Sequence, residues 1–255
     1  MSNTSKQTAA RGMRLCILLA IIITTVALTV TAQAAARKTS AGSAKKSNPA
    51  MEKIPDDPKL PRVLLIGDSI SIGYTLPVRE LLKGKANVHR IPANGGPTIN
   101  GLKALDSWLG SSKWDVIHFN WGLHDLKYMG PNNENLADPK APTSRQQVPL
   151  PEYEKNLRSL VARLKKTGAK LIWCTTTPVA PETQGRVSGD EVKYNEAALR
   201  VMKEAGVAID DLYAFAKPKL SKIQLPANVH FTPEGYQELA GQVAAAIEKA
   251  LPTGK

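Results

Sequence analysis

The sequence predicts an α/β fold, in which a parallel sheet is covered by helices on both faces. Two observations predict it. From residue 60 onward, short apolar runs of strand length alternate with segments whose apolar residues recur at the helical period. The chain has 255 residues, 42% of them hydrophobic, which is enough for one substantial domain and too few for two large ones. We therefore expect a single domain over residues 60–252.

Five apolar runs are expected to form the strands of the sheet. They cover residues 63–66, 87–91, 116–120, 171–175 and 207–209. Five strands with helices between them favour a flavodoxin-like, doubly wound parallel sheet. Ligands of such sheets bind beyond the carboxyl ends of the strands, so the residues that follow each run are the first candidates for a site.

The spacing of apolar residues predicts two of the covering helices. One stripe consists of Tyr153, Leu157, Leu160, Val161 and Leu164, and a second of Tyr236, Leu239, Ala240, Val243 and Ile247. Thr232 followed by Pro233 marks the start of the second helix. Residues 126–150 and 178–190 fit no regular element, and loops this long in a compact domain usually serve a site.

Residues 1–36 are typical of a secretory signal peptide. Lys6, Arg11 and Arg14 precede an uncharged apolar run at 15–30, and the pattern Ala-Gln-Ala-Ala-Ala follows at 32–36. The run is roughly 16 residues long, below the ~20 that cross a bilayer as a helix, so a retained anchor is the less favoured interpretation. The sequence thus predicts a secreted or periplasmic protein that meets the membrane only through its signal peptide.

The charge distribution argues against nucleic acid as a partner. The net charge is +12, and residues 1–59 account for half of it, with nine Lys or Arg against three acidic residues. Residues 37–59, rich in Ala, Ser, Lys and Pro, are expected to form a basic low-complexity linker able to touch anionic envelope polymers. No aromatic or Gly-rich recognition motif accompanies the charge.

Cys174 is the only cysteine that remains once the signal peptide is removed. No intramolecular disulfide can therefore form, even in an oxidising compartment. The residue lies in an apolar run with no adjacent basic group, which predicts buried packing rather than a nucleophile.

Ser69 is the candidate nucleophile. Residues 63–71 read VLLIGDSIS, a buried strand followed by Gly-Asp-Ser where the chain should turn into a helix. Gly67 permits the tight turn that presents the hydroxyl at the carboxyl end of the first strand. Taken alone, the same pattern also fits a serine that only caps the following helix.

His230 is the candidate base. Residues 228–236 read NVHFTPEGY, which places this histidine in a loop just before the C-terminal helix. A serine hydroxyl is a poor nucleophile on its own, and imidazole titrates near neutrality, so a histidine is the base suited to activate it. Of the other histidines, His89 and His118 fall inside predicted strands.

Four motifs now stand in order: GDSI at 67–70, ANGGPT at 93–98, NWGLHD at 120–125 and VHFTPEGY at 229–236. They resemble the four blocks of the SGNH, or GDSL-like, hydrolases over residues 61 to about 250. The resemblance implies a three-layer flavodoxin-like fold, Ser and His catalysis, no cofactor and no metal. It also implies an oxyanion hole made by the nucleophile's amide, a Gly amide and an Asn side chain. Gly96 matches that Gly, and Asp68, beside the nucleophile, is expected to line the site.

The chain departs from the family pattern at two positions. The third block normally reads Gly-x-Asn-Asp, whereas His124 stands here in place of the Asn; either His124 or Asn120 could donate instead, or neither. The triad acid usually lies three residues before the His, where this chain has Ala227, and Asn228 is the nearest polar substitute. Because an amide cannot stabilise imidazolium as a carboxylate does, we expect a Ser-His dyad, oriented by a carbonyl, or a weak enzyme.

The function expected from these residues is ester hydrolysis through an acyl-Ser69 intermediate. Family analogy favours a short acyl group, namely acetyl on a carbohydrate, with a small-molecule or polysaccharide ester as the substrate. Trp121, Tyr128 and Trp173 would suit sugar stacking, although packing at the edge of the core explains them as well. An acyl transferase on the same scaffold and a catalytically weak glycan-binding protein are the alternatives.

Overall fold

The computed structural model describes residues 48–252. The predicted signal peptide and the first part of the predicted linker lie outside the described residues. Within residues 48–252, no helix is long and apolar enough to span a bilayer.

The main sheet has five parallel strands, as predicted. They are β1 (Arg62–Ile66), β2 (Asn87–Arg90), β3 (Val116–Phe119), β6 (Lys170–Cys174) and β7 (Ala208–Asp210). Their order is β2-β1-β3-β6-β7, and every neighbouring pair is parallel. The chain winds outward in both directions from β1 and β3, which is the flavodoxin-like order and confirms the predicted fold. The predicted runs located all five strands to within one residue, and the central strands β1 and β3 are largely apolar because both of their faces are buried.

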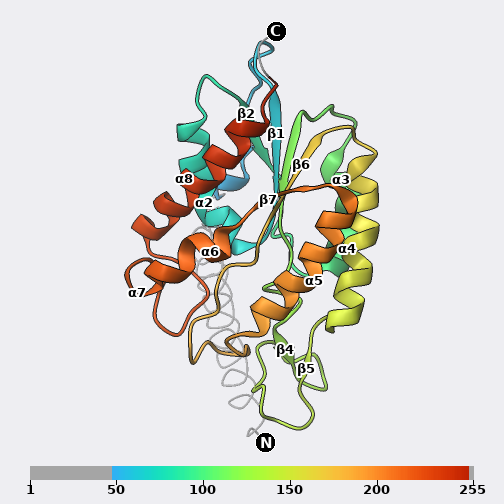
Figure 1. The fold of residues 1–255 in the computed structure, drawn as a ribbon, viewed down its shortest axis with the longest axis vertical. Coiled ribbons are helices and arrows are strands. Elements are labelled where there is room, and N and C mark those ends of the chain that lie inside the picture. Colours follow the sequence, from blue (N-terminus) through green and yellow to red (C-terminus); the bar gives the residue numbers. More distant parts are fainter. Residues whose placement is uncertain (1–47, 253–255) are drawn as a thin grey trace, which may run out of the picture. The chain divides into compact units, whose positions relative to one another are not determined.

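Helices cover both faces of the sheet (Figure 1). α2 (Ser69–Leu81) and α8 (Pro233–Ala250) pack against each other on one face, and α3 (Thr98–Leu109), α4 (Leu150–Lys165) and α5 (Asp190–Ala205) cover the other. The remaining helical segments are η1 (Pro49–Met51), α6 (Leu212–Ala216), η2 (Lys217–Lys219) and α7 (Leu220–Ile223). Both predicted apolar stripes face the core, since every large residue of the first stripe and all of the second except Tyr236 are buried.

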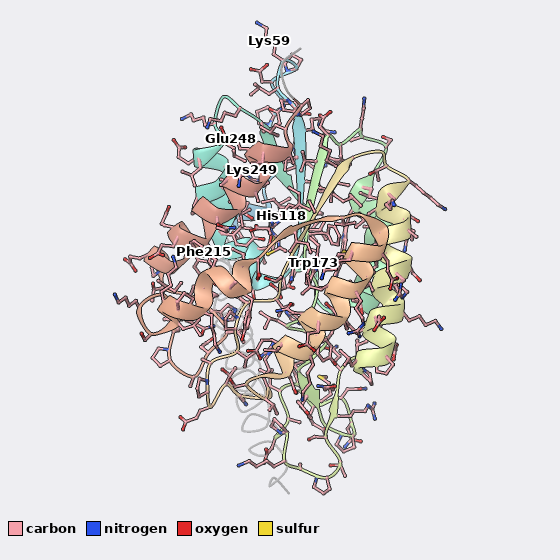
Figure 2. All side chains as sticks on the ribbon, in the orientation of Figure 1. Lys59, His118, Trp173, Phe215, Glu248 and Lys249 are labelled. Atoms are coloured by element: carbon pink, nitrogen blue, oxygen red, sulfur yellow. The ribbon has the colours of Figure 1, made fainter. Side chains whose placement is uncertain are left out.

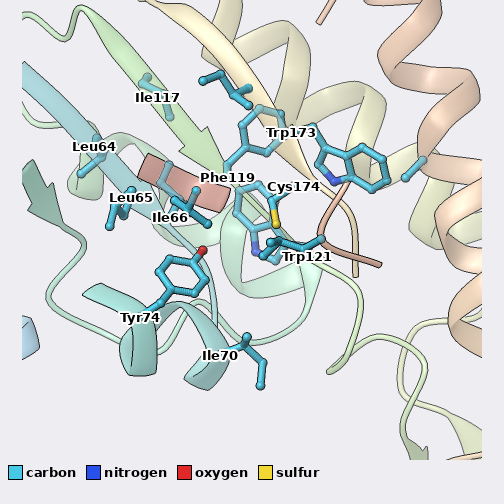
Figure 3. Packing of buried hydrophobic residues seen from close by; sticks show 14 of the residues in the cluster. Leu64, Leu65, Ile66, Ile70, Tyr74, Ile117, Phe119, Trp121, Trp173 and Cys174 are labelled. Carbon is cyan, nitrogen blue, oxygen red and sulfur yellow. The ribbon is translucent and has the colours of Figure 1, made fainter. Parts of the chain in front are cut away.

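The core contains two of the three aromatic residues considered for sugar stacking. Trp121 and Trp173 are 1% and 0% exposed, and Figure 3 shows both indoles among the packed side chains next to the strands. They cannot stack on a sugar, so their role is core packing. Tyr128, which is half-buried, is the only one of the three with access to solvent.

The two long segments without predicted structure differ from each other. The first contains a short antiparallel ribbon of β4 (Tyr128–Met129) and β5 (Arg145–Gln146), which lies beyond one end of the main sheet (Figure 1). Strands of two residues leave no periodicity in a sequence, which is why the pattern did not reveal them. Residues 178–190 lack regular structure, as expected, until α5 begins at Asp190.

Residues 48–59, the end of the predicted linker, are mostly exposed, and hydrogen bonds tie some of them to the domain. Arg79 of α2 donates to the carbonyls of Pro49 and Glu52, and Asn87 of β2 exchanges two hydrogen bonds with the backbone of Asp57. The bonds use only backbone atoms of residues 48–59, so they do not depend on which side chains this segment carries. Its composition could therefore not indicate them.

Candidate active site

Ser69 lies at the first turn of α2, directly after β1. Asp68 is the N-cap of this helix, and its Oδ1 accepts a hydrogen bond from the amide of Ile70 at 2.9 Å. A Cβ on Gly67 would lie 2.7 Å from that of Ser71, so only glycine fits this turn. Asp68 holds the turn through this bond, and its expected place in the substrate-binding surface stays a prediction. Ser69 is half-exposed while Gly67 and Asp68 are buried.

Arg90, at the end of β2, holds the backbone around the nucleophile. Its guanidinium donates to the carbonyls of Gly67 and Asp68 at 2.7 and 3.0 Å, and to those of Ile91 and Ala93 at 2.9 and 2.7 Å. Burial lowers the pKa of Arg90 to about 10, which leaves it protonated at neutral pH. One buried cation thus ties the turn after β1 to the turn after β2.

His230 is hydrogen-bonded to the nucleophile. Its Nε2 lies 2.9 Å from the Oγ of Ser69, and its Nδ1 lies 2.8 Å from the Oδ1 of Asn228. Oδ1 of Asn228 also accepts the backbone N–H of His230 at 3.0 Å. Ser69, from the start of the domain, therefore forms one hydrogen-bonded series with His230 and Asn228 near its end. Ala227, at the family's usual acid position, is exposed with φ 48°.

The backbone bond from His230 settles the tautomer of its imidazole. A backbone N–H can only donate, so the Asn228 atom that receives it is the oxygen. The same oxygen then accepts from Nδ1, which must carry the proton. Nε2 is left with a free lone pair that faces the hydroxyl of Ser69, which is the arrangement a general base needs.

The glycines of the second block pack against the nucleophile turn. The amide of Gly95 donates to the carbonyl of Gly67 at 2.9 Å, and a Cβ on Gly95 would lie 2.9 Å from that oxygen. Gly96 has φ 58°, a left-handed conformation that favours glycine. Its amide, expected to face a developing oxyanion, donates instead to Oδ1 of Asn94 at 2.9 Å.

Asp125 of the third block fixes the start of α3. Its Oδ1 accepts from the amide and the hydroxyl of Thr98 at 2.8 and 2.6 Å, and that hydroxyl also accepts from Asn156 of α4. The carboxyl is fully buried, and burial raises its pKa to about 7 although the Thr98 bonds lower it.

The two proposed substitutes for the missing oxyanion Asn differ in availability. Asn120 donates its amide hydrogens to the carbonyl of Cys174 at 2.7 Å and toward Oγ1 of Thr176 at 3.4 Å, so they are already engaged. His124 is half-buried, and burial lowers the pKa of its imidazole. The charge of Asp68 raises this pKa, but the effect of burial is larger. A neutral imidazole at this position keeps one N–H to donate.

One cluster of metal-binding residue types occurs among residues 48–252. His118, Cys174 and Asp210 bring their ligand atoms within 4.8 Å of one another, inside the sheet (Figure 2 labels His118). Nε2 of His118 is 2.9 Å from Oδ2 of Asp210, and burial raises the pKa of the Cys174 thiol well above its ordinary value. The cluster is a buried hydrogen-bonded pair beside a neutral thiol, and Cys174 is buried as predicted.

Three cations around the site were not expected from the sequence. They are Arg90, Lys127 and Arg186. Arg90 is the last residue of the mostly buried strand β2, and a charge at the end of a buried strand was the signal available for it. Lys127 and Arg186 lie in the segments without periodic pattern, where charged residues are ordinarily exposed.

The sheet order and a Ser–His pair beyond the carboxyl end of β1 are the arrangement of a serine hydrolase. The chain belongs to the GDSL-like lipase/acylhydrolase family, whose model matches residues 65–238. This agrees with the SGNH, or GDSL-like, blocks found in the sequence.

Two relatives in this family have moderate identity. A GDSL esterase/lipase of Arabidopsis thaliana is 27% identical over 219 residues, which covers 74% of this chain and 86% of the relative. An isoamyl acetate-hydrolyzing esterase 1 homolog of Homo sapiens is 27% identical over 139 residues, and this match spans 49% of this chain and 55% of the human protein.

Solved structures share the fold at low identity. A lipase/acylhydrolase from Enterococcus faecalis has a TM-score of 0.60 at 18% identity, covering 76% of this chain and 99% of that one. The acetylxylan esterase Axe2 from Geobacillus stearothermophilus has a TM-score of 0.58 at 21% identity, covering 73% and 94%. The acetyl xylan esterase AlAXEase has a TM-score of 0.58 at 16% identity, covering 73% and 99%.

Proposed function

We propose that this protein is a serine esterase in which Ser69 is the nucleophile and His230 the general base. The observation that carries the proposal is the hydrogen-bonded series from Ser69 through His230 to Asn228, with distances of 2.9 and 2.8 Å. Membership of the GDSL-like lipase/acylhydrolase family supports an ester as the substrate.

The proposed reaction has two steps. In the first, Nε2 of His230 takes the hydroxyl proton as Oγ of Ser69 attacks the ester carbonyl, and the imidazolium returns that proton to the leaving alcohol. In the second, His230 takes a proton from the water that attacks the acyl-Ser69, and it returns this proton to Oγ of Ser69 as the bond to the acyl group breaks and the acid is released. Asn228 orients the ring throughout, much as an Asn does in Cys-His-Asn proteases.

The oxyanion formed in each step needs donors. Ser69 is the first residue of α2, where backbone N–H groups have no partner within the helix. Its amide and the N–H of a neutral His124 are the two donors we assign, because the amide of Gly96 and the side chain of Asn120 are engaged elsewhere. One such donor is worth about 3 kcal/mol of the barrier.

The proposed substrate is a short acyl ester of a carbohydrate. Two of the solved structures with this fold are described as acetylxylan esterases, which supports acetate on a sugar. Export through the signal peptide at 1–36 would bring the enzyme to such polymers. We expect the mature chain to begin near Ala35 or Arg37, which N-terminal sequencing of the exported protein would check.

The direct test is Ser69→Ala. This variant should lose hydrolysis of p-nitrophenyl acetate and labelling by a fluorophosphonate, while its thermal melt stays within a few degrees of wild type. Retained turnover would remove Ser69 as the nucleophile. Acetate release from acetylated polysaccharides, followed with and without a sugar acceptor, then separates hydrolysis from acyl transfer. If the wild-type protein shows neither fluorophosphonate labelling nor ester hydrolysis, the alternative of a glycan-binding protein is favoured.

A further inference from the structure

Two cations lie beside His124, outside the catalytic series. Lys127 follows the third block in the chain, and Arg186 comes from the irregular segment 178–190. Nε of Arg186 donates to the carbonyl of Leu123 at 3.0 Å, and the amide of Tyr128 donates to the carbonyl of Gly185 at 2.8 Å. These two hydrogen bonds join the segments on either side of residues 124–127. Lys127 and Arg186 therefore lie near each other.

Neither cation has an ion-pair partner among residues 48–252. Nε of Arg186 is engaged with a carbonyl, but its two terminal nitrogens and the ammonium of Lys127 form no hydrogen bond there. Lys127 is only 8% exposed, and burial, followed by the charge of Arg186, lowers the pKa of its ammonium. Two like charges held together and partly out of water are a costly arrangement unless an anion joins them.

The acidic groups that face these cations are already engaged. Asp68 attracts Arg186, but its Oδ1 accepts the amide of Ile70. Asp125 attracts Lys127, but its Oδ1 is bonded to Thr98, and with a pKa raised to about 7 by burial it is only partly ionised at neutral pH. Neither carboxylate forms a salt bridge with the cations, so no acidic side chain in the described part of the chain pairs directly with Lys127 or Arg186.

The cations adjoin the reaction centre. Burial has the largest effect on the pKa of His124 and lowers it, and the charge of Asp68 opposes this effect. The charges of Lys127, Arg186 and His230 lower the pKa further, so the His124 ring lies within electrostatic reach of all three. Substrate groups near the ester would therefore lie in the field of Lys127 and Arg186.

We propose that Lys127 and Arg186 form a subsite for a carboxylate on the molecule that carries the ester, so that the substrates are acylated acidic sugars such as O-acetylated uronic acids. This rests on the proposed esterase function and narrows its substrate class. The two terminal nitrogens of Arg186 match the two oxygens of a carboxylate, and the ammonium of Lys127 adds a point charge. In the rival explanation, Lys127 and Arg186 stabilise the oxyanion of every ester, whether or not the substrate carries a carboxylate.

A matched pair of esters separates the two. Methyl glucoside and methyl glucuronoside, acetylated at the same ring hydroxyl, differ only in a neutral CH₂OH against a carboxylate. Wild type should show a kcat/KM roughly ten- to hundredfold higher for the glucuronoside. In Arg186→Gln and Lys127→Gln this ratio should fall toward one, and in Arg186→Lys it should be intermediate. Lys140→Gln, at an exposed lysine in the segment that contains the β4–β5 ribbon, is the matched control and should keep the wild-type ratio.

Equal kcat/KM for both esters in wild type would overturn the proposal. So would variants that lose activity on both esters by the same factor, because that outcome assigns the cations to the oxyanion. Failure of the esterase function itself would appear as no hydrolysis of either ester and no fluorophosphonate labelling. Calorimetric binding of methyl glucuronoside against methyl glucoside, measured on Ser69→Ala and on Ser69→Ala with Arg186→Gln, decides the anion subsite independently. Preferential glucuronoside binding that Arg186→Gln removes supports the subsite, and equal binding overturns it.

Discussion

Asn228, one residue after the family's usual acid position, contacts Nδ1 of His230, the ring nitrogen that a triad carboxylate would contact. Its Oδ1 fixes the Nδ1–H tautomer of His230 and so performs the orienting half of the carboxylate's role. The other half, electrostatic stabilisation of the imidazolium formed on attack, needs a negative charge that an amide lacks. In a serine protease, a triad Asp replaced by Asn lowers turnover roughly 10⁴-fold, largely through the wrong tautomer. Because the tautomer here is correct, we expect a smaller deficit.

Asn228→Asp tests how large that deficit is. A carboxylate oxygen at the site of Oδ1 would lie 2.8 Å from Nδ1 and 3.0 Å from the backbone N–H, so it keeps both bonds and adds the charge. The expected result is a rise in kcat/KM on a short-chain ester, of about tenfold or more, mainly in kcat. The measurement is made beside wild type, with His230→Ala as the floor. A variant no faster than wild type would show that the missing charge does not limit the reaction.

The two halves of the catalytic pair belong to two packed helices. Ser69 begins α2, and His230 lies three residues before the first residue of α8. The helices are neighbours on one face of the sheet (Figure 1), so the separation of Oγ from Nε2 depends on how closely they approach. Gly73 sets this approach, because a Cβ there would overlap the ring of Tyr236.

Gly73→Ala should therefore weaken catalysis without touching substrate. The added methyl group displaces Tyr236 and the first turn of α8, which lengthens the Ser69–His230 contact, and a displacement near 1 Å can cost about 100-fold in rate. The expected loss is in kcat, with KM little changed. Gly241→Ala is the matched control, since a Cβ there meets nothing within 4 Å and should raise stability by about 1 kcal/mol.

Tyr236→Leu in the Gly73→Ala background should restore part of the rate, because the smaller side chain leaves room for the methyl group. Gly73→Ala with wild-type kcat would instead show that Tyr236 swings away without moving α8.

The sequence pattern predicted the five strands but only some of the helices, because α3 and α5 were not identified although buried residues recur at the helical period along both. The five strands and the helices from Leu150 and Pro233 follow from buried apolar positions. The β4–β5 ribbon is held by backbone bonds and by its contacts with the rest of the domain. Such segments are decided by tertiary contacts, which a local sequence pattern does not contain.

The residues of the candidate site could be predicted from the sequence only where they lie in a short recognisable motif. Ser69, His230 and Asn228 were found from two motifs, and the structure brings all three together. Which donor faces the oxyanion could not be decided, because that depends on the hydrogen bonds that engage Gly96 and Asn120. Arg186 reaches the site through the fold of an irregular segment, and no motif marks it.

The stability of the whole domain should depend on pH through Asp125. Its pKa is about 7 in the folded protein and 3.8 as the ordinary value. Between these values the folded state holds a proton that the unfolded state has released, so the free energy of unfolding falls as pH rises from about 4 to about 7. A shift of this size corresponds to a loss of up to about 4 kcal/mol.

Asp125→Asn should flatten this part of the profile, because its amide does not titrate and its oxygen can still accept from Thr98. Urea unfolding of both proteins at pH 5 and pH 8 measures the difference in slope, and comparing slopes cancels the other titrating groups. Parallel profiles for the two proteins would show that Asp125 is ionised in the folded state across this range.

Ser69 and His230 are separated by 161 residues in the chain, so the candidate site cannot form until nearly the whole domain has been synthesised. Ser69 is synthesised early, whereas His230 is synthesised just before the last helix, α8. During synthesis and any passage through a membrane in extended form, the serine has no partner to activate it. Under the proposed mechanism, hydrolysis requires α8 to be docked beside α2, so we expect activity only once the domain has folded.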